Sequence, residues 1–142
     1  MRYFVRYLER ARLPLVFVLA AACSSTTAPQ LGEEFSLRLG EQATIADIGV
    51  TITFADVSED SRCPSNVTCV WAGDAVVVIA SWTAAAGEGT EVLHSHLEPQ
   101  SVRIDSVELE FVRLDPYPEE PGIISPEDYV VTLSTRSAAP PN

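Results

Sequence analysis

The sequence predicts an all-β protein: a single Ig-like β-sandwich, or a small barrel, of about seven or eight short antiparallel strands. Apolar and polar residues alternate in short runs from Glu34 onward, which is the period of half-buried strands. Glycines and prolines separate these runs at intervals of about 12 residues, as turns do in sandwiches. A chain of 142 residues is short enough for one domain. The cysteine–tryptophan–cysteine spacing of true immunoglobulin domains is absent, so only the sandwich shape is expected.

The first strands follow the alternation closely. Residues 35–39 place three apolar side chains on one side, and Gly40 then turns the chain. A short strand is expected over residues 43–46. In residues 50–55, valine, isoleucine and phenylalanine alternate with threonine and alanine, so we expect a strand with one face in the core.

The later strands vary more in pattern. Residues 75–82 contain the apolar run Val76–Ile79, which is typical of a central strand covered on both faces. The glycines of residues 84–89 predict a turn. Further strands are expected over residues 92–97, 107–111 and 129–135. Between the last two, residues 115–128 hold four of the ten prolines and are expected to form a stiff loop.

The amino-terminal segment has the features of a secretory signal. Four arginines precede a short apolar stretch, Leu13–Ala22, which ends in small residues. That stretch is shorter than the roughly 18 apolar residues that span a bilayer. An export signal, rather than a membrane-spanning helix, is therefore expected.

The end of this segment, Ala20-Ala21-Ala22-Cys23 with Leu19 one place early, resembles the lipobox of bacterial lipoproteins. The resemblance implies acylation of the Cys23 thiol, cleavage before Cys23 and anchorage in a lipid bilayer, with each buried CH₂ adding about 0.8 kcal/mol. An ordinary secretory signal cut nearby is the alternative. In such lipoproteins an aspartate after the cysteine favours retention in the inner membrane. Ser24 stands there instead, so we expect an outer-membrane lipoprotein of the cell envelope, facing the periplasm or the surface.

Removal of the signal makes the chain more acidic. The complete chain has 9 basic residues, all arginine, against 20 acidic ones and a net charge of −11, and the 120 residues from Cys23 onward carry −14. Nucleic acid is excluded as a partner because binding it needs a basic face. The expected divisions are a signal peptide at 1–22, a lipid-anchored flexible tether at 23–32, the β-sandwich at 33–136 and a disordered tail at 137–142.

Cys63 and Cys69 are expected to form a disulfide, since nearby cysteines of exported proteins usually pair. A loop this short adds roughly 2 to 2.5 kcal/mol in the chain-entropy model. Pro64 and Asn66 are turn formers that let the chain double back. Two alternatives are less well supported: the spacing is not that of a C-x-x-C redox pair, and a metal site would need further ligands.

The residues around the cysteines resemble a group of small bacterial lipoproteins that share the phrase Asp-Ser-Arg-Cys-Pro…Cys-x-Trp-x-Gly. Here the phrase occupies residues 60–64 and 69–73, and the likeness extends to the Asp115–Pro118 turn and the strand at 128–133. The group carries no established activity. The resemblance therefore implies export and a fold, and leaves the function open.

Candidate binding residues follow the second cysteine and occupy the proline-rich loop. Trp71 either offers an exposed aromatic face or packs over the disulfide, and we favour packing, with Gly73 permitting a turn. Arg62 is expected to pair with Asp60 or Asp74 as local support. The proline-rich loop is the expected recognition surface, because binding residues concentrate on loops of rigid sandwiches. The possible binding residues are Trp71, Asp74, Tyr117, Glu119 and Glu120.

The chemistry of these residues favours a non-enzymatic lipoprotein that presents its sandwich to a protein partner in the envelope. A first alternative is a copper- or zinc-binding lipoprotein that uses His94 and His96, which share one face of a strand. Calcium binding by the acidic loop (Glu119, Glu120, Glu127 and Asp128) lacks the ligand order of an EF-hand. A hydrolase is the second alternative, but no G-x-S-x-G or H-E-x-x-H pattern supplies a nucleophile or zinc ligands. No cofactor is expected.

Overall fold

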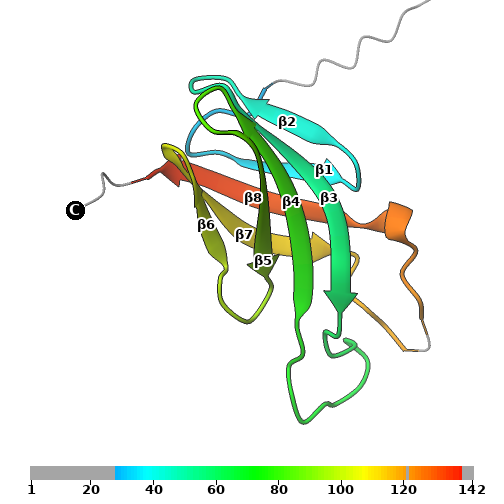
Figure 1. Ribbon diagram of the computed structural model, residues 1–142. Coiled ribbons are helices and arrows are strands. Elements are labelled where there is room, and N and C mark those ends of the chain that lie inside the picture. Colours follow the sequence, from blue (N-terminus) through cyan, green and yellow to red (C-terminus); the bar gives the residue numbers. More distant parts are fainter. Residues whose placement is uncertain (1–27, 121, 139–142) are drawn as a thin grey trace, which may run out of the picture.

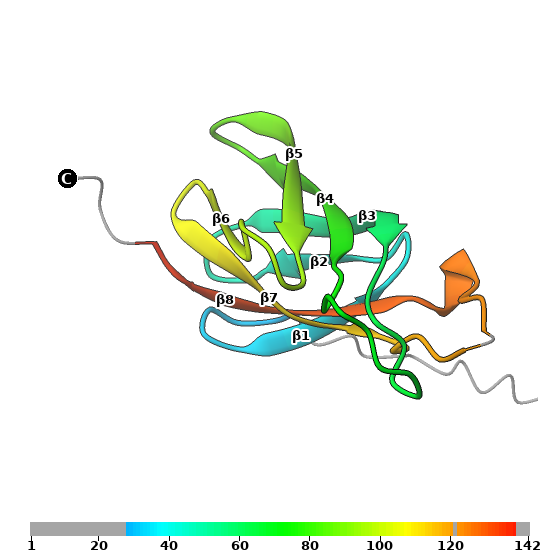
Figure 2. The same ribbon diagram turned by 90° about the horizontal axis from the view of Figure 1, so that it is seen from below.

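The computed structural model describes residues 28–120 and 122–138, which form a small β-sandwich (Figures 1 and 2). Two four-stranded antiparallel sheets face each other. The strands are β1 (Glu34–Arg38), β2 (Gln42–Ile45), β3 (Val50–Asp60), β4 (Ala75–Thr83), β5 (Gly87–His94), β6 (Ser101–Ile104), β7 (Val107–Asp115) and β8 (Val130–Ser137). A single 3₁₀ turn, Pro126–Asp128, precedes β8. The predicted all-β sandwich is confirmed.

The first sheet has the order β1-β8-β7-β6 and the second the order β2-β3-β4-β5. The chain changes sheets after β1 and again after β5, and the last strand returns to pair with the first. Long strands β3 and β4 run side by side at the centre of the second sheet (Figure 1). Within the described residues no helix is long and apolar enough to cross a membrane.

Alternation along the strands fills the space between the sheets. In β3, Val50, Ile52 and Phe54 are fully buried, while Thr51 and Thr53 between them are only partly covered. Buried aliphatic side chains of β7 and β8 meet them from the first sheet. One contiguous core results, as expected when two half-apolar sheets pack face to face.

The expectation that Val76–Ile79 is covered on both faces is wrong. In β4, Val77 and Ile79 are buried, whereas Val76 and Val78 are half-buried on the outer face of the sheet. β4 is central because strands pair with both of its edges, not because a second layer covers its back. Valine suits this position, since a β-branched side chain fits a pleated, half-buried surface.

The turn expected over residues 84–89 is shorter than predicted. Only Ala84–Ala86 form the turn, and β5 begins at Gly87 and ends at His94 rather than extending to Leu97. Gly89 lies within this strand opposite Ser81. A Cβ at position 89 would lie 2.6 Å from the Ser81 hydroxyl oxygen, so glycine allows the two strands to approach.

The described ends of the chain are more ordered than expected. Pro29, placed in the predicted flexible tether, is buried and its carbonyl accepts a hydrogen bond from Ala46 N–H at 3.3 Å. Gly32 N–H donates to Thr135 O at 2.9 Å, and Leu31 packs against the core. At the other end β8 includes Ser137. The predicted signal peptide, the predicted lipidation site Cys23 and residues 139–142 lie outside the described residues.

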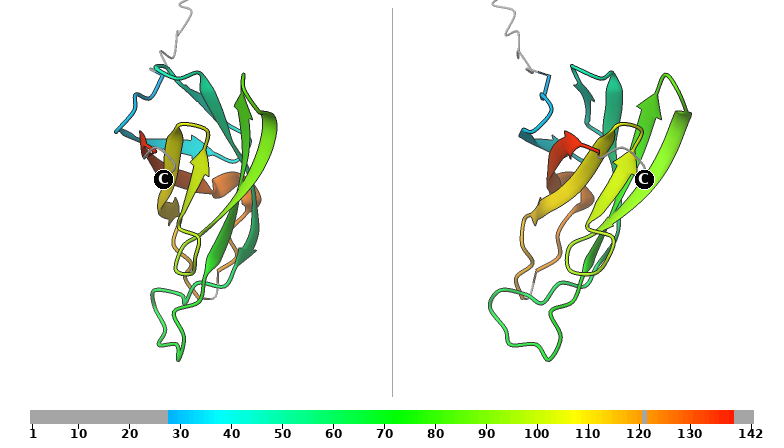
Figure 3. Two further views of the ribbon diagram at one scale, coloured as in Figure 1. Left: turned by 60° about the vertical axis from the view of Figure 1, so that its left-hand side comes forward. Right: turned by 90° about the vertical axis from the view of Figure 1, so that its left-hand side faces the viewer.

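The two poles of the sandwich differ. Residue 28 and the β2–β3 turn lie at one pole, and three loops gather at the other (Figures 1 and 3). We call this second pole the loop end: residues 61–74 after β3, 95–100 after β5, and 115–120 with 122–125 after β7. The 11 residues of β3 connect the poles, a distance of about 33 Å at the usual strand rise.

Candidate functional site

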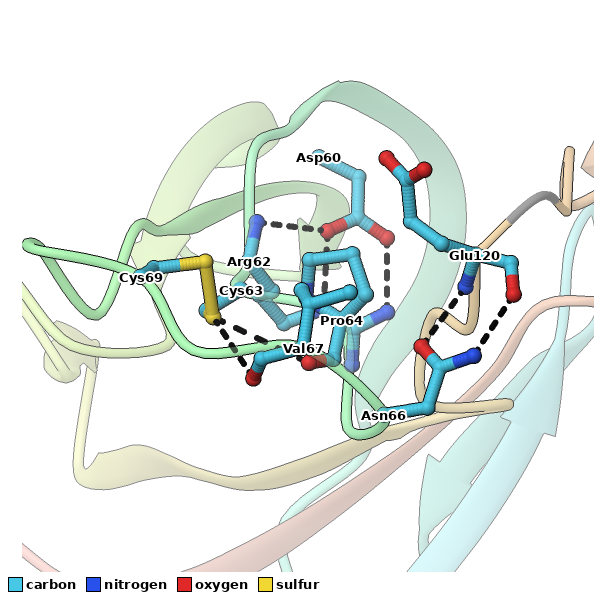
Figure 4. The surroundings of a disulfide bond; sticks show 8 residues. All are labelled: Asp60, Arg62, Cys63, Pro64, Asn66, Val67, Cys69 and Glu120. Carbon is cyan, nitrogen blue, oxygen red and sulfur yellow. Dashed lines mark hydrogen bonds and ion pairs between the residues drawn. A yellow bond between two sulfur atoms is a disulfide. The ribbon is translucent and has the colours of Figure 1, made fainter.

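A disulfide closes the first loop of the loop end. Cys63 and Cys69 are bonded with their Cα atoms 5.9 Å apart, which confirms the predicted pair (Figure 4). At the base of the loop, Cys63 N–H donates to Ala72 O at 2.9 Å. Gly73 has φ +70°, and a Cβ there would collide with the Ser61 carbonyl oxygen. The left-handed backbone and the close approach at Gly73 therefore require glycine.

The buried Arg62 guanidinium joins the disulfide loop to the proline-rich loop. Its side chain forms a bidentate pair with Asp60, with Nε–Oδ1 at 2.8 Å and Nη2–Oδ2 at 2.6 Å (Figure 4). The guanidinium also donates to two carbonyl oxygens at the end of β7, Leu114 O at 2.6 Å and Pro116 O at 3.0 Å. Arg62 is 5% exposed. Its pairing with Asp60, rather than with Asp74, resolves the alternative that the sequence left open.

Asp60 is held in its charged form by these contacts. Burial pushes its pKa upward, but hydrogen bonds and charge from Arg62, together with the Tyr129 hydroxyl at 3.0 Å, outweigh burial and lower the pKa. In the opposite sense, burial and the hydrogen bond to Asp60 raise the pKa of Tyr129 to about 12. The Tyr129 hydroxyl thus remains a donor to Asp60 at any ordinary pH.

Further contacts link the two loops along their length. Ser65 N–H donates to Pro118 O at 2.9 Å. The Asn66 amide donates to Glu120 O at 2.6 Å and accepts from Glu120 N–H at 2.9 Å (Figure 4). Arg62 Cζ lies 5.0 Å from the centre of the Tyr117 ring, in a cation–π contact. The candidate residues Tyr117, Glu119 and Glu120 therefore share one surface with the disulfide loop, Glu119 through a 3.5 Å contact with Ser65.

Asp74 connects the disulfide loop to the third loop. Its Oδ2 lies 2.6 Å from His94 Nδ1, and its Oδ1 accepts from the Ser95 hydroxyl at 3.0 Å and from His96 N–H at 2.8 Å. Burial raises the Asp74 pKa, but the hydrogen bonds from His94, His96 and Ser95 outweigh it and lower the pKa to about 2. Asp74 is 8% exposed, so it positions the loop rather than offering a free polar contact.

A groove runs between the first and third loops. It has a volume of about 570 Å³, and its lining includes Trp71, Val76, His94, His96 and Leu97. A smaller hollow of about 370 Å³ lies beside it, between Tyr117 and the end of β7. His96 lines both spaces. The groove is mainly apolar, with a few polar atoms held in place by Asp74, which is the usual make-up of a ligand-binding cleft.

The expectation that Trp71 packs over the disulfide is wrong. Its side chain is 83% exposed, on the rim of the groove. A seven-residue disulfide loop of turn formers has no apolar face large enough to cover an indole ring. The alternative that the sequence also offered, an exposed aromatic face, is the one observed. Val70, Leu97 and Ile123 are exposed at the same end.

The histidines supply fewer metal ligands than a zinc site uses. Structural and catalytic zinc sites have three or four protein ligands. Across residues 28–120 and 122–138, no group of three or more histidine, cysteine, aspartate or glutamate side chains is placed to hold a metal ion. His94 Nδ1 is already engaged by Asp74, and His96 Nδ1 lies 3.1 Å from the Ser95 hydroxyl.

Sequence reasoning missed the roles of Ser95 and Leu97. Ser95 accepts a hydrogen bond from Ala75 N–H at 2.8 Å while donating to Asp74, and so ties the start of β4 to the third loop. A serine between two histidines gives no local sign of this role, because its partners lie 20 and 21 residues away. Leu97 had a usable signal, since it is an apolar residue two positions before Pro99, where a turn is expected.

Replacing Arg62 with lysine should destabilise the protein by about 2–4 kcal/mol, because lysine keeps the charge but cannot reproduce the bidentate fork and the two carbonyl contacts. Urea denaturation would measure the change. The matched control is Arg113→Lys, in an exposed pair with Asp115 at 2.7 Å, which should cost no more than about 1 kcal/mol. Equal losses in the two variants would contradict the anchoring role of Arg62.

Acid should weaken the loop end through Asp74. A carboxyl group with a folded pKa of about 2 against an ordinary 3.8 stabilises the fold above pH 4 and loses that contribution as the pH falls from 4 toward 2. Asp74→Asn should therefore lower the free energy of unfolding at pH 7, by on the order of 2 kcal/mol. Its stability should also fall less steeply below pH 4, where Asp60 still contributes. Denaturation midpoints at several pH values test this, and an acid profile as steep as that of the wild type would count against it.

Comparison with models of known families, with curated proteins and with solved structures finds no match to this chain.

Proposed function

We propose that this protein is a lipid-anchored, non-enzymatic lipoprotein of the bacterial cell envelope, whose disulfide-stapled β-sandwich binds a partner protein through the loop end. The observation that carries the proposal is the cluster of exposed apolar side chains on loops that are otherwise tightly fixed. Trp71 and Leu97 border the groove, and Val70 on the first loop and Ile123 on the proline-rich loop are exposed at the same end. Exposed apolar groups gathered on one surface of a soluble domain usually mark an interaction site.

Rigidity of these loops supports a binding role. The disulfide, the Arg62 network and the Asn66–Glu120 pair hold the first two loops together. The Asp74 network holds the third. A surface that is already ordered loses little conformational entropy when a partner binds. Exposed tryptophan is also among the residues that contribute most to binding energy at protein interfaces.

The position of the loop end supports anchorage by the amino terminus. Pro29 is hydrogen-bonded to Ala46 in the β2–β3 turn, at the pole of the sandwich opposite the loop end (Figure 1). A lipid on Cys23 would therefore hold the protein by the pole away from the groove. The net charge of −14 from Cys23 onward argues that acyl chains, and not electrostatic attraction to anionic lipids, provide the attachment.

Lipid anchorage is tested by Cys23→Ser. Loss of the acylated thiol should move the protein from the membrane fraction to the soluble fraction, because the folded domain has no other described attachment. Fractionation followed by immunoblotting measures the change, and Cys63→Ser with Cys69→Ser serves as the control that removes the other two cysteines, and with them the disulfide, without removing the lipid. A Cys23→Ser protein that still sediments with membranes through an acyl group would contradict the proposal.

Partner binding at the loop end is tested by site-specific photo-crosslinking in cells. A photoreactive residue at position 71 should give a discrete adduct with one protein, and Leu97→Ser should reduce its yield several-fold, since it removes apolar area from the same groove. The control places the photoreactive residue at position 34, which is exposed on β1. Equal adducts at positions 34 and 71, or none at 71, would reject the loop end as the binding surface.

A further inference from the structure

The outer faces of the two sheets differ in chemistry. On the first sheet, Arg136 pairs with Glu108 at 2.7 Å and with Glu110 at 3.0 Å, so this face carries ion pairs. Around the hollow of the second sheet's outer face, Glu88 is the one charged side chain. In a domain this acidic, a surface hollow with a single charged side chain is unusual.

Strand register builds this second face in rows. Thr51, Trp82 and Glu88 lie directly opposite one another on β3, β4 and β5. The next row is Gln42, Thr53, Ala80 and Thr90 across all four strands. The short Ala80 side chain between longer neighbours leaves a shallow hollow of about 490 Å³. The turn of the β4–β5 hairpin projects away from the first sheet beside it (Figures 2 and 3).

Most polar side chains around the hollow form no hydrogen bond or ion pair within the described fold, and Thr51 is the exception. Thr51 bonds to Thr44 at 3.0 Å. The side chains of Gln42, Thr53, Glu88 and Thr90 make no hydrogen bond or ion pair with any other described residue. Trp82 is 48% exposed and lies among them. An indole ring surrounded by free hydroxyl, amide and carboxylate groups is open to a ligand that has both apolar and hydroxylated faces.

We propose that the outer face of the second sheet, centred on Trp82, binds a neutral oligosaccharide of pyranose sugars. One face of a pyranose ring presents C–H groups, whose partial positive charge suits the negative face of an indole ring. Its hydroxyl groups both donate and accept, and they match threonine hydroxyls, the glutamine amide and the acceptor oxygens of Glu88. The rows span several strands about 4.8 Å apart, which suits a short chain of sugars rather than a single ring.

Charge restricts the class of sugar. The hollow contains no arginine, and the chain contains no lysine. Anionic polysaccharides would meet the uncompensated Glu88 and the field of a domain at −14, which repels them. The site is separate from the loop end, because its lining shares no residue with the groove beside Trp71. Its existence does not depend on the proposed protein partner.

Isothermal titration of the complete protein, purified in mild detergent, tests the proposal. The probes are three neutral hexasaccharides (cellohexaose, maltohexaose and hexa-N-acetylchitohexaose) and hexagalacturonate as the anionic comparison. We expect saturable binding of at least one neutral probe, and none of hexagalacturonate. Trp82→Ala should weaken the binding at least about tenfold, the equivalent of about 1.4 kcal/mol.

Two further variants make the outcome decisive. Trp71→Ala removes the other tryptophan and should leave sugar binding unchanged, so a loss there would place the sugar at the loop end instead. Thr90→Val keeps the shape and strand preference of the side chain but removes its hydroxyl, and should weaken binding about three-fold or more. The proposal is overturned if no neutral probe binds, if Trp82→Ala binds as well as the wild type with an unchanged melting temperature, or if hexagalacturonate binds equally.

Discussion

The arrangement of the loop end depends on one buried cation. A guanidinium taken out of water is costly unless charge and hydrogen bonds compensate it fully. Arg62 receives both charge compensation from Asp60 and carbonyl oxygens from the end of β7. Because those partners come from two parts of the chain that are distant in sequence, the end of β3 and residues 114–116, the guanidinium can be satisfied only when both are in place. Compensation of the buried Arg62 charge thus fixes the relative positions of the segments that form the loop end.

A second polar network repeats this arrangement with the opposite charge. Asp74 is a buried carboxylate that collects donors from His94, Ser95 and His96. At the loop end the charged side chains Arg62 and Asp74 are buried and fix the loops, whereas large apolar side chains are exposed. This inverts the usual order of a protein domain, in which apolar groups are inside and charges outside. The inversion leaves Trp71 and Leu97 available at the surface without loosening the loops that carry them.

Sequence periodicity was enough to predict the class of fold. The alternation of apolar and polar residues predicted β3, β7 and β8. The disulfide between Cys63 and Cys69 was predicted because nearby cysteines in an exported protein usually pair. Two predictions were wrong, that Val76–Ile79 is covered on both faces and that Trp71 packs over the disulfide. Both depend on which parts of the chain lie nearby in space, which local sequence does not reveal. A run of apolar residues does not reveal whether a second layer lies behind it. Local sequence also suggested Asp60 as a partner of Arg62, but the carbonyl partners lie 52 and 54 residues away and become neighbours only through the topology.

The docking of Pro29 onto the domain fixes how far the sandwich can stand from a bilayer. With the chain held from residue 28 onward, five residue steps separate Ala28 from Cys23. Fully extended, they reach about 17 Å. If Cys23 carries the lipid as proposed, the pole that contains Pro29 lies no more than about 17 Å from Cys23. The loop end lies roughly a further 33 Å away, which is the length of β3. The molecule would then hold its groove at the end of the domain that is farthest from the lipid anchor. A partner would be met well beyond the layer of lipid head groups, at a height set by the strand length rather than by a flexible linker.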